Sequence, residues 1–520
     1  MRENKGTLSL QKLCAAAVLG AAALAQTSPA DVPRMGDKTA VAADKAHAKA
    51  YAFDLNQVQL LPGPFKQAQA LDRENMLAVD MDALYYPFRR EAHLPSPVKG
   101  SDGLGWQVTG HMLGHYLSAA AMLWRNTGDE AIKKRADAAV AVLAECQAAH
   151  GNGYIGGFPE KSILELEGLV KDPSAHANVP WYCLHKVYAG LLDMYVLAGN
   201  RQALDVLEKA AGWIEKNLGQ LNDQQMEAML KTEHGGMKDV LANLYAATGK
   251  ETYLKLAERF THHAVVDPFL QGKDPLDGLH ANTQFPKFIG LARQYELTGD
   301  APLAKVAQAF WDSVVNARSY VTGGNSIGEH FSPKGRLSEF VGANTSESCN
   351  EYNMLKLTRH LFCSDPQPKY ADYYERTLLN HILSARHPED GGQLYFQQLE
   401  SGRSKGGWAV FAKGGNSCCC GTGLESAAKF ADSIYFHDGG DGLFVNLFIP
   451  SALNWSEKGV TVRQETAYPA EGKSRLSFTC QKPQSLTLRV RRPWWAASEF
   501  QLLVNGQRQE IGRASCRERV

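Results

Sequence analysis

The sequence predicts a mainly α-helical fold, an (α/α)6 barrel (a toroid of paired helices) followed by an antiparallel β-sandwich domain that is truncated at the C-terminus. Three observations predict it. Between residues 105 and 436, apolar residues recur every three to four positions, as on one face of a helix. After residue 436 they recur every two positions, as in half-buried strands. The length of 520 residues also exceeds that of one ordinary domain.

The helical part is predicted to hold about twelve helices in pairs. Apolar spacing marks them at 116–124, 131–145, 182–197, 238–247, 253–264, 288–297, 303–315, 352–362, 370–383 and 424–435. Four runs end in a glycine that follows an aromatic residue by four positions, at Trp124/Gly128, Tyr195/Gly199, Tyr245/Gly249 and Tyr295/Gly299. A glycine there suits a left-handed helix C-cap.

Repeated helix pairs form either an open solenoid or a closed toroid. Long segments separate the pairs, at 150–178, 266–281, 317–346 and 388–418. They favour the toroid, because a toroid gathers its loops at one end, where they can build a site.

The alternating part predicts strands at 443–449, 460–466, 474–480, 485–491 and 500–504. The barrel is therefore placed at 53–437 and an incomplete sandwich at 438–509. Residues 510–520 (EIGRASCRERV) break the alternation and resemble the translation of a sequencing-adapter read-through. We exclude them from the predicted fold and expect the natural chain to continue after Gln509.

The N-terminus has the pattern of a cleaved secretion signal. Basic residues precede the apolar run Leu13–Ala25, which ends in Ala-Leu-Ala. We predict a signal peptide at 1–25, a flexible leader at 26–52 and a periplasmic or extracellular location. After this run, no segment has the roughly 18 unbroken apolar residues of a membrane helix, so no membrane span is predicted.

The composition is that of a folded globular protein, with 44% hydrophobic and 21% charged residues. Lys plus Arg and Asp plus Glu number 55 each, so the formal net charge is zero. A nucleic-acid-binding protein needs a basic surface, which this balance does not favour.

Two short clusters carry a possible metal site: Glu347-Ser348-Cys349 and Cys418-Cys419-Cys420. Thiolates together with a carboxylate form a ligand set suited to zinc. A purely structural zinc site that joins two loops, or three free buried thiols, are the alternatives. Free thiols are less expected in an oxidising compartment.

A glycine-rich segment, Tyr320–Phe331, contains one carboxylate, Glu329. In a partly apolar pocket, desolvation would raise its pKa and make it a proton donor. The alternative is a solvated loop residue.

Several histidines lie beside glycines or aromatic residues, where helices are expected to begin. His111 and His115 share one helical face, and the others are His185, His234 and His280. A single histidine is more often a hydrogen-bonded structural residue than a ligand. Tyr395 is one of several aromatic residues that could stack on a sugar, although aromatic residues more often fill a core.

These segments together resemble a known family, the cysteine-nucleophile β-L-arabinofuranosidases of glycoside hydrolase families 127 and 146, long a domain of unknown function. The matching stretches run in order along the chain: 53–65, 110–119, 179–193, 233–249, 279–290, 320–331, 347–362, 418–436 and 488–495. The resemblance implies an (α/α)6 barrel followed by β-sandwiches, in agreement with the periodicity.

The resemblance also implies roles for single residues. Glu347, Cys349, Cys418 and Cys419 match the family's zinc ligands, and Cys418 matches its nucleophile. Glu329 matches the acid/base residue. His185 and His280 match sugar-binding positions, and we include His111, His115, His234 and Tyr395 among the substrate-binding candidates. Cys420 stands where a residue without a thiol is commoner, so either Cys419 or Cys420 could complete the metal site.

The resulting hypothesis is an exported, zinc-dependent, retaining glycosidase that removes β-L-arabinofuranosyl units from plant-type glycans. In it, Cys418 attacks the sugar and Glu329 protonates the leaving oxygen. The alternatives are a glycosidase of the same mechanism for another sugar, a non-catalytic zinc-stapled toroid that binds glycans, and another (α/α)6 enzyme such as a lyase or epimerase.

Overall fold

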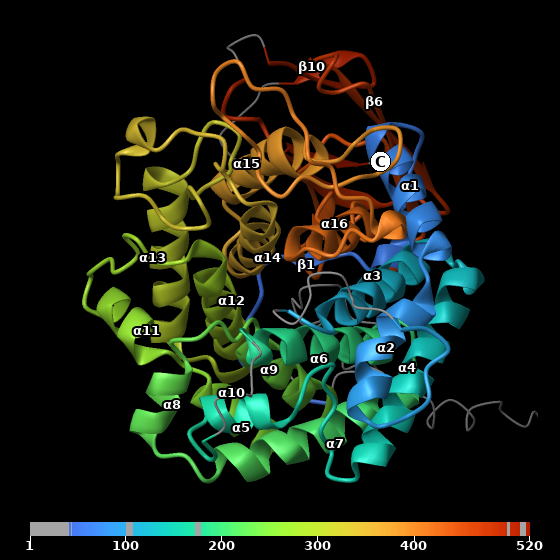
Figure 1. Cartoon of the computed structure of the whole chain (residues 1–520). Helices are drawn as coiled ribbons and strands as arrows, with labels where there is room; N and C mark the ends of the chain where they lie inside the picture. Colours follow the sequence, from blue (N-terminus) through green and yellow to red (C-terminus); the bar gives the residue numbers. More distant parts are fainter. Residues whose placement is uncertain are drawn as a thin grey trace, which may run out of the picture.

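The structure is a computed structural model that describes residues 41–42, 44–99, 108–171, 178–496, 500–509 and 516–519 (Figure 1). The predicted signal peptide at 1–25 and the leader up to residue 40 lie outside the described residues, as do residues 510–515 of the predicted read-through.

Six inner helices form a closed ring around the centre of the barrel (Figure 1). They are α3 (His111–Thr127), α6 (Pro180–Val196), α9 (Met237–Thr248), α12 (Ala281–Thr298), α14 (Ser348–Ser364) and α16 (Cys418–Ala428). Each packs against the next in this order, and α16 packs against α3, which closes the ring. The predicted toroid is confirmed.

An outer helix backs each inner one. The outer helices are α4 (Glu130–His150), α7 (Arg201–Leu218), α10 (Glu251–Arg259), α13 (Ala301–Ala317), α15 (Pro368–Thr377) and α1 (Pro64–Ala78). The last of these pairs with α16, so the two ends of the barrel sequence meet.

Shorter helices lie in the connections: α2 (Met81–Glu91), α5 (Lys161–Leu166), α8 (Asp223–Met229), α11 (His263–Leu270) and a π-helical turn, η5 (Leu378–Leu383). Two predicted loops, 150–178 and 266–281, therefore contain or overlap helices. Among the described residues, no helix combines the length and apolarity that crossing a bilayer would need.

The glycines of the repeat follow the ends of four inner helices. Gly128, Gly249 and Gly299 are C-caps as predicted, whereas Gly199 lies two residues after Leu197, the C-cap of α6. Gly128, Gly199, Gly249 and Gly299 have φ values of 72, 69, 73 and 74°. The amide of each glycine donates to the carbonyl of the aromatic residue four positions earlier, at 2.7–3.1 Å. These bonds satisfy carbonyls that a helix end leaves without a partner.

Residues 41–50 run across the C-terminal ends of three inner helices. In this segment, the backbone amides of two neighbouring residues donate to the same helix carbonyl, and such pairs recur every four residues. The amides of 41 and 42 donate to Ala246 of α9, those of 45 and 46 to Glu296 of α12, and those of 49 and 50 to Cys363 of α14. The carboxylate of Asp44 pairs with the fully buried Arg293 at 3.0 Å. We call this segment the N-terminal strap. Backbone hydrogen bonds and the Asp44–Arg293 ion pair hold it to the barrel. The described part of the predicted leader, up to residue 52, therefore differs from the flexible segment that we expected.

Two main sheets form the β domain. The first has the order β1 (Tyr51–Ala52), β3 (Tyr435–His437), β4 (Gly442–Val445), β8 (Ser485–Val490) and β11 (Cys516–Arg519). The second has the order β2 (Val58–Leu60), β5 (Ser451–Trp455), β6 (Val460–Thr466) and β7 (Ser474–Cys480), and a separate pair joins β9 (Leu502–Val504) to β10 (Gln507–Gln509).

Three features of this domain differ from the prediction. The strand expected at 443–449 is present only to Val445, where β4 ends; residues 446–449 lie in no strand, and β5 begins at Ser451. All strand pairs are antiparallel except β4 with β8, which is parallel. Strand β1 comes from the end of the predicted leader and β2 from the beginning of the predicted barrel. The backbone of β11, inside the predicted read-through at 510–520, pairs with β8.

Candidate active site at the helix N-termini

The sequence-predicted site residues gather where inner helices begin. His111 is the first residue of α3, His280 the N-cap of α12, Glu347 the N-cap of α14 and Cys418 the first residue of α16. The N-terminus of a helix carries partial positive charge and unpaired N–H groups, which favour anions. The barrel therefore supplies a site that stabilises thiolates and carboxylates.

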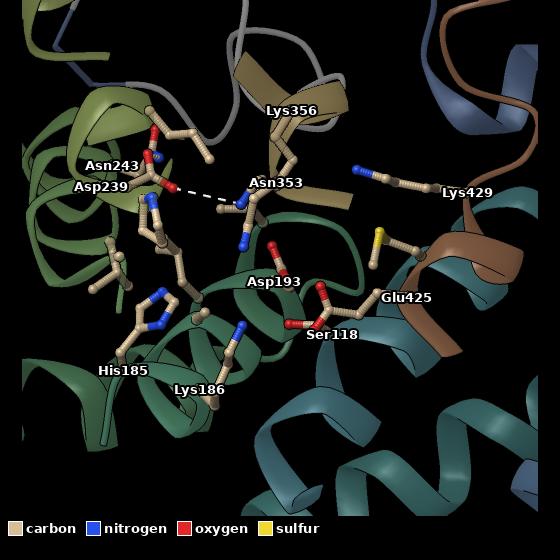
Figure 2. A pocket seen from close by; sticks show the side chains of 18 of the residues that line it. Ser118, His185, Lys186, Asp193, Asp239, Asn243, Asn353, Lys356, Glu425 and Lys429 are labelled. Carbon is tan, nitrogen blue, oxygen red and sulfur yellow. Dashed lines mark hydrogen bonds and ion pairs between the residues drawn. The ribbon is translucent and has the colours of Figure 1, made fainter. Parts of the chain in front are cut away.

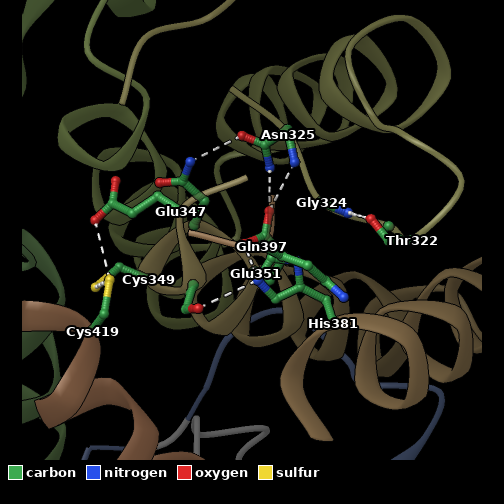
Figure 3. Close-up of polar contacts among 12 residues, drawn as sticks. Thr322, Gly324, Asn325, Glu347, Cys349, Glu351, His381, Gln397 and Cys419 are labelled. Carbon is green, nitrogen blue, oxygen red and sulfur yellow. Dashed lines mark hydrogen bonds and ion pairs between the residues drawn. The ribbon is translucent and has the colours of Figure 1, made fainter. Parts of the chain in front are cut away.

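One carboxylate and three thiols form a compact cluster there. The ligand atoms of Glu347, Cys349, Cys418 and Cys419 all lie within 4.8 Å of one another. Figure 3 shows three of these residues, Glu347, Cys349 and Cys419, side by side. Sγ of Cys419 lies 3.3 Å from that of Cys349 and 4.0 Å from that of Cys418. Oε1 of Glu347 lies 3.6 and 3.7 Å from the sulfurs of Cys418 and Cys419.

These distances suit a tetrahedral metal ion. Zinc–sulfur bonds near 2.3 Å and zinc–oxygen bonds near 2.1 Å give edges of about 3.8 Å between two sulfurs and about 3.6 Å between sulfur and oxygen. Oε2 of Glu347 is buried without a hydrogen-bond partner in the described structure. A divalent cation would satisfy this carboxylate, so the cluster could hold one.

The pKa shifts of the cluster residues also fit a bound cation. Burial raises the pKa values of Glu347, Cys349 and Cys419 well above their ordinary range. Hydrogen bonds from the thiols of Cys349 and Cys419 instead hold the pKa of Cys418 well below its ordinary value. Cys418 is thus the thiol best able to ionise, and a bound cation would offset the charge of the remaining acids.

Cys420 does not join the cluster. Its buried sulfur faces the carbonyl of Ala409 at 3.8 Å. Successive residues on a helix point about 100° apart, so the side chain of the third cysteine turns away from the side that carries Cys418. Of the two candidates left open by the sequence, Cys419 is the one beside Glu347.

Glu329 lies on the other side of Cys418, with Tyr395 between them. The Tyr395 hydroxyl donates a short hydrogen bond to Oε1 of Glu329 and lies 3.5 Å from Sγ of Cys418. Nε2 of His280 lies 3.3 Å from Oε2 of Glu329. The structure therefore brings Glu329, His280 and Tyr395 together with the cysteine cluster.

The pKa of Glu329 differs from the expectation. The hydrogen bond from His280, which outweighs burial, lowers it, and the hydrogen bond from Tyr395 lowers it further. Burial alone would lower the pKa of His280, but the hydrogen bond to Glu329 and the charge of Glu233 raise it. Both shifts favour the ion pair, in which the proton is on the imidazole.

His111 and His115 lie beneath the site. Both are fully buried, and burial lowers the pKa of each. The Nδ1 atom of His115 bonds Glu425 of α16 at 2.5 Å, and its ring packs on Gly421 of the same helix. The ring of His115 thus supports the helix that carries the cysteines, and its contact with substrate stays a prediction.

His185 lines a cavity of about 80 Å³ inside the ring of helices (Figure 2). All six inner helices contribute to this axial cavity. Its charged lining residues are Lys186, Asp193, Asp239, Lys356, Glu425 and Lys429. The structure thus places His185 on the cavity side of α6.

His234 points away from the cysteine cluster, and its neighbour Glu233 takes its place. The His234 ring is buried against Phe260 and His262. Burial raises the pKa of Glu233 to about 7, and the nearby charges of His280 and Cys418 also act on it. The sequence analysis chose the histidine of this pair, and spacing alone does not show which side chain turns inward.

A family model described as the β-L-arabinofuranosidase GH127 catalytic domain matches residues 57–432, and one for the GH127 middle domain matches 442–515. No curated protein matches the chain.

Solved structures show the same fold. A GH127 β-arabinofuranosidase, BT3674, superposes with a TM-score of 0.74 at 21% identity, covering 91% of this chain and 79% of that one. A GH127 β-L-arabinofuranosidase from Geobacillus stearothermophilus T6 gives 0.70 at 21%, covering 89% and 79%. The catalytic-domain model spans most of the barrel, so the chain belongs to glycoside hydrolase family GH127 and is a glycoside hydrolase of the β-L-arabinofuranosidase type.

Proposed function

We propose that the protein is a retaining β-L-arabinofuranosidase that releases terminal β-L-arabinofuranosyl units from plant-type glycans, with Cys418 as nucleophile and Glu329 as acid/base. The contact of one hydroxyl group, that of Tyr395, with both residues carries the proposal. It means that a nucleophile and a proton donor face one small space, as cleavage with retention requires. The two solved relatives named above are both described as β-arabinofuranosidases.

The reaction would proceed in two displacements. Sγ of Cys418 attacks the anomeric carbon while the bond to the leaving oxygen breaks and Glu329 gives that oxygen a proton. The carboxylate of Glu329 then takes a proton from water, whose oxygen attacks the same carbon and releases the sulfur. Two inversions give overall retention.

Glu329 needs a proton before the first step. Nε2 of His280 lies 3.3 Å from its carboxylate, and the raised pKa of His280 keeps a proton within reach. Binding of a sugar removes water from the pair, which favours its neutral form and so moves the proton toward the carboxylate.

We also propose zinc as the metal, held by Glu347, Cys349, Cys418 and Cys419. The three-sulfur, one-oxygen donor set and the distances between these atoms support it. When bound, zinc would keep the nucleophilic thiol ionised and fix its direction.

The experiment compares the wild type with Cys418→Ser and Glu329→Gln on p-nitrophenyl β-L-arabinofuranoside. Cys418→Ser loses the nucleophile, and Glu329→Gln loses the base that the second step needs. General acid–base catalysis contributes about 10²–10⁴-fold, so we expect at least about a hundredfold loss of turnover in each variant. Turnover close to that of the wild type in both variants would overturn the mechanism. An aryl-glycoside panel tests the sugar: preference for another glycone would keep the mechanism and replace the substrate.

Export is a further proposal, and it rests on the basic and apolar N-terminal pattern alone. Expression of the whole chain in a bacterial host, followed by fractionation and N-terminal peptide mapping, tests it. A mature N-terminus near Gln26 outside the cytoplasm supports export, and an intact Met1 in the cytoplasm contradicts it.

A further inference from the structure

A buried carboxylate outside the reaction itself, Glu351, connects the two halves of the active site. It lies on α14, one helical turn after Glu347 and two residues after Cys349. Its side chain is fully buried. The helix that carries two of the cluster's four ligand residues therefore also carries this acid.

Glu351 holds the loop that carries Glu329. Its Oε1 atom accepts two hydrogen bonds from Asn325, one from the backbone amide at 2.9 Å and one from the side-chain amide at 3.1 Å (Figure 3). Asn325 is only four residues from Glu329. A carboxyl oxygen accepts such bonds whether or not the group is protonated.

The loop needs such an anchor, because its backbone is held in an unfavourable conformation. Ser326 and Glu329 have φ values of 75° and 68°, in the left-handed region that side chains disfavour. Ser346, just before the ligand Glu347, has 57°. Strained residues persist only where neighbouring contacts fix them, and they gather at functional sites.

Other contacts run through the same point. The amide of Asn350, next to Glu351, donates to Ser326 Oγ at 2.9 Å and to Asn325 Oδ1 at 3.2 Å. On the opposite side, Nε2 of His381 lies 3.3 Å from Oε2 of Glu351. His381 belongs to the π-helical turn η5, a rare element that often occurs at functional sites.

We propose that Glu351 is a positioning residue that sets the distance between the acid/base Glu329 and the nucleophile Cys418. It does so by tying the 320–331 loop to the first turns of α14. Its loss would leave the cysteine cluster in place and let Glu329 move. This inference rests on the proposed function for its kinetic consequence, but the structural tie itself does not depend on the substrate.

The test compares Glu351→Gln, which keeps an acceptor oxygen for Asn325, with Glu351→Leu, which has similar volume and no acceptor. Asn325→Ala removes one donor from the loop side, and Glu296→Gln controls for loss of a buried carboxylate far from the site. Three quantities are measured: zinc per chain, hydrogen exchange of the 322–331 segment, and kcat/KM for aryl glycosides with leaving groups of different pKa.

We expect Glu351→Leu and Asn325→Ala to keep their zinc and to exchange the 322–331 amides about tenfold faster or more, because a protecting bond is lost. Their loss of kcat/KM should grow as the leaving group becomes more basic, since only poor leaving groups need the proton of Glu329. Glu351→Gln should stay within about threefold of the wild type, because it keeps the acceptor oxygen.

Unchanged exchange in both Glu351→Leu and Asn325→Ala overturns the proposal. A second outcome also overturns it. In that outcome, Glu351→Leu loses its zinc and loses kcat/KM equally for all leaving groups, while Asn325→Ala behaves like the wild type. Glu351 would then have only a structural role. If the wild type itself hydrolyses none of these glycosides, the proposed function fails. The exchange measurement then still decides whether Glu351 holds the loop.

Discussion

Glu329 and Cys418 are joined through a single hydroxyl group. Tyr395 donates a hydrogen bond to the Glu329 carboxylate, and the same oxygen lies 3.5 Å from Sγ of Cys418. An acid and a thiol that contact the same oxygen atom lie close enough together for both to act on one glycosidic bond.

Removal of the shared hydroxyl should weaken catalysis without affecting the metal. We expect Tyr395→Phe to lower kcat/KM by about 10- to 100-fold, since a hydrogen bond to a charged group contributes about 1.5–3 kcal/mol. Zinc content should stay the same. Tyr435→Phe, which removes a buried hydroxyl from the β domain, is the matched control and should leave kcat/KM unchanged. Equal kinetics in the two variants would contradict a role for the Tyr395 hydroxyl.

The pair His280–Glu329 should define the pH profile. The pKa of His280 is raised, so its proton is retained above the ordinary histidine pKa of about 6.5 and lost as the pH rises further. We expect kcat/KM to fall on that alkaline side. His280→Gln removes the proton and should lower kcat/KM at neutral pH and shift the alkaline limb. A variant profile that superposes on the wild type after scaling would rule out His280 as the titrating group.

Gly421 should be required for the cysteine cluster. A Cβ atom at this position would lie 2.3 Å from the His115 ring, which the bond to Glu425 holds in place. Gly421→Ala should therefore displace the first turn of α16, weaken zinc binding and reduce activity at least tenfold, because second-layer changes typically cost about 10–100-fold.

Gly212, in the outer helix α7, is the control for that substitution, because a Cβ there meets no atom within 4 Å. Gly212→Ala should stabilise the protein by about 0.5–1 kcal/mol and leave zinc binding unchanged. Metal titration of both variants decides the matter. Full zinc affinity in Gly421→Ala would show that the helix adapts.

The N-terminal strap should contribute to stability and not to catalysis. Asp44→Ala removes one of the two carboxylates, those of Asp44 and Glu296, that pair with the buried Arg293, so we expect a loss of about 2 kcal/mol in the free energy of unfolding in urea. Lys49 lies on the same strap and forms an exposed ion pair with Asp365, which follows α14. Lys49→Ala breaks this pair and should change stability by about 0–1 kcal/mol. Activity of the folded protein should stay constant in both. Equal stability of the two variants would contradict the buried pair's role.

Local patterns explain what the sequence could predict. The link between Gly128 and Trp124 depends on residues four apart, so it is visible in the sequence. The strap could not be found in this way, because its partners are carbonyls of three helices far along the chain. The direction of side chains was similarly hidden. Spacing along the chain does not show that the charge of Cys418 acts on Glu233 while the ring of its neighbour His234 packs on Phe260.

The central claim is that Cys418 forms a covalent bond to the sugar. The most direct measurement is the mass of the Cys418-containing peptide after Glu329→Gln is incubated with an aryl β-L-arabinofuranoside that has a good leaving group. This variant can form the thioglycoside without acid assistance but lacks the base for its hydrolysis. We predict a peptide that is heavier by one pentosyl residue and carries the modification on Cys418. The double variant Glu329→Gln, Cys418→Ser should lack this modification. An unmodified Cys418 while the aryl group is released in a stoichiometric burst, or a pentosyl group on another residue, would contradict the account.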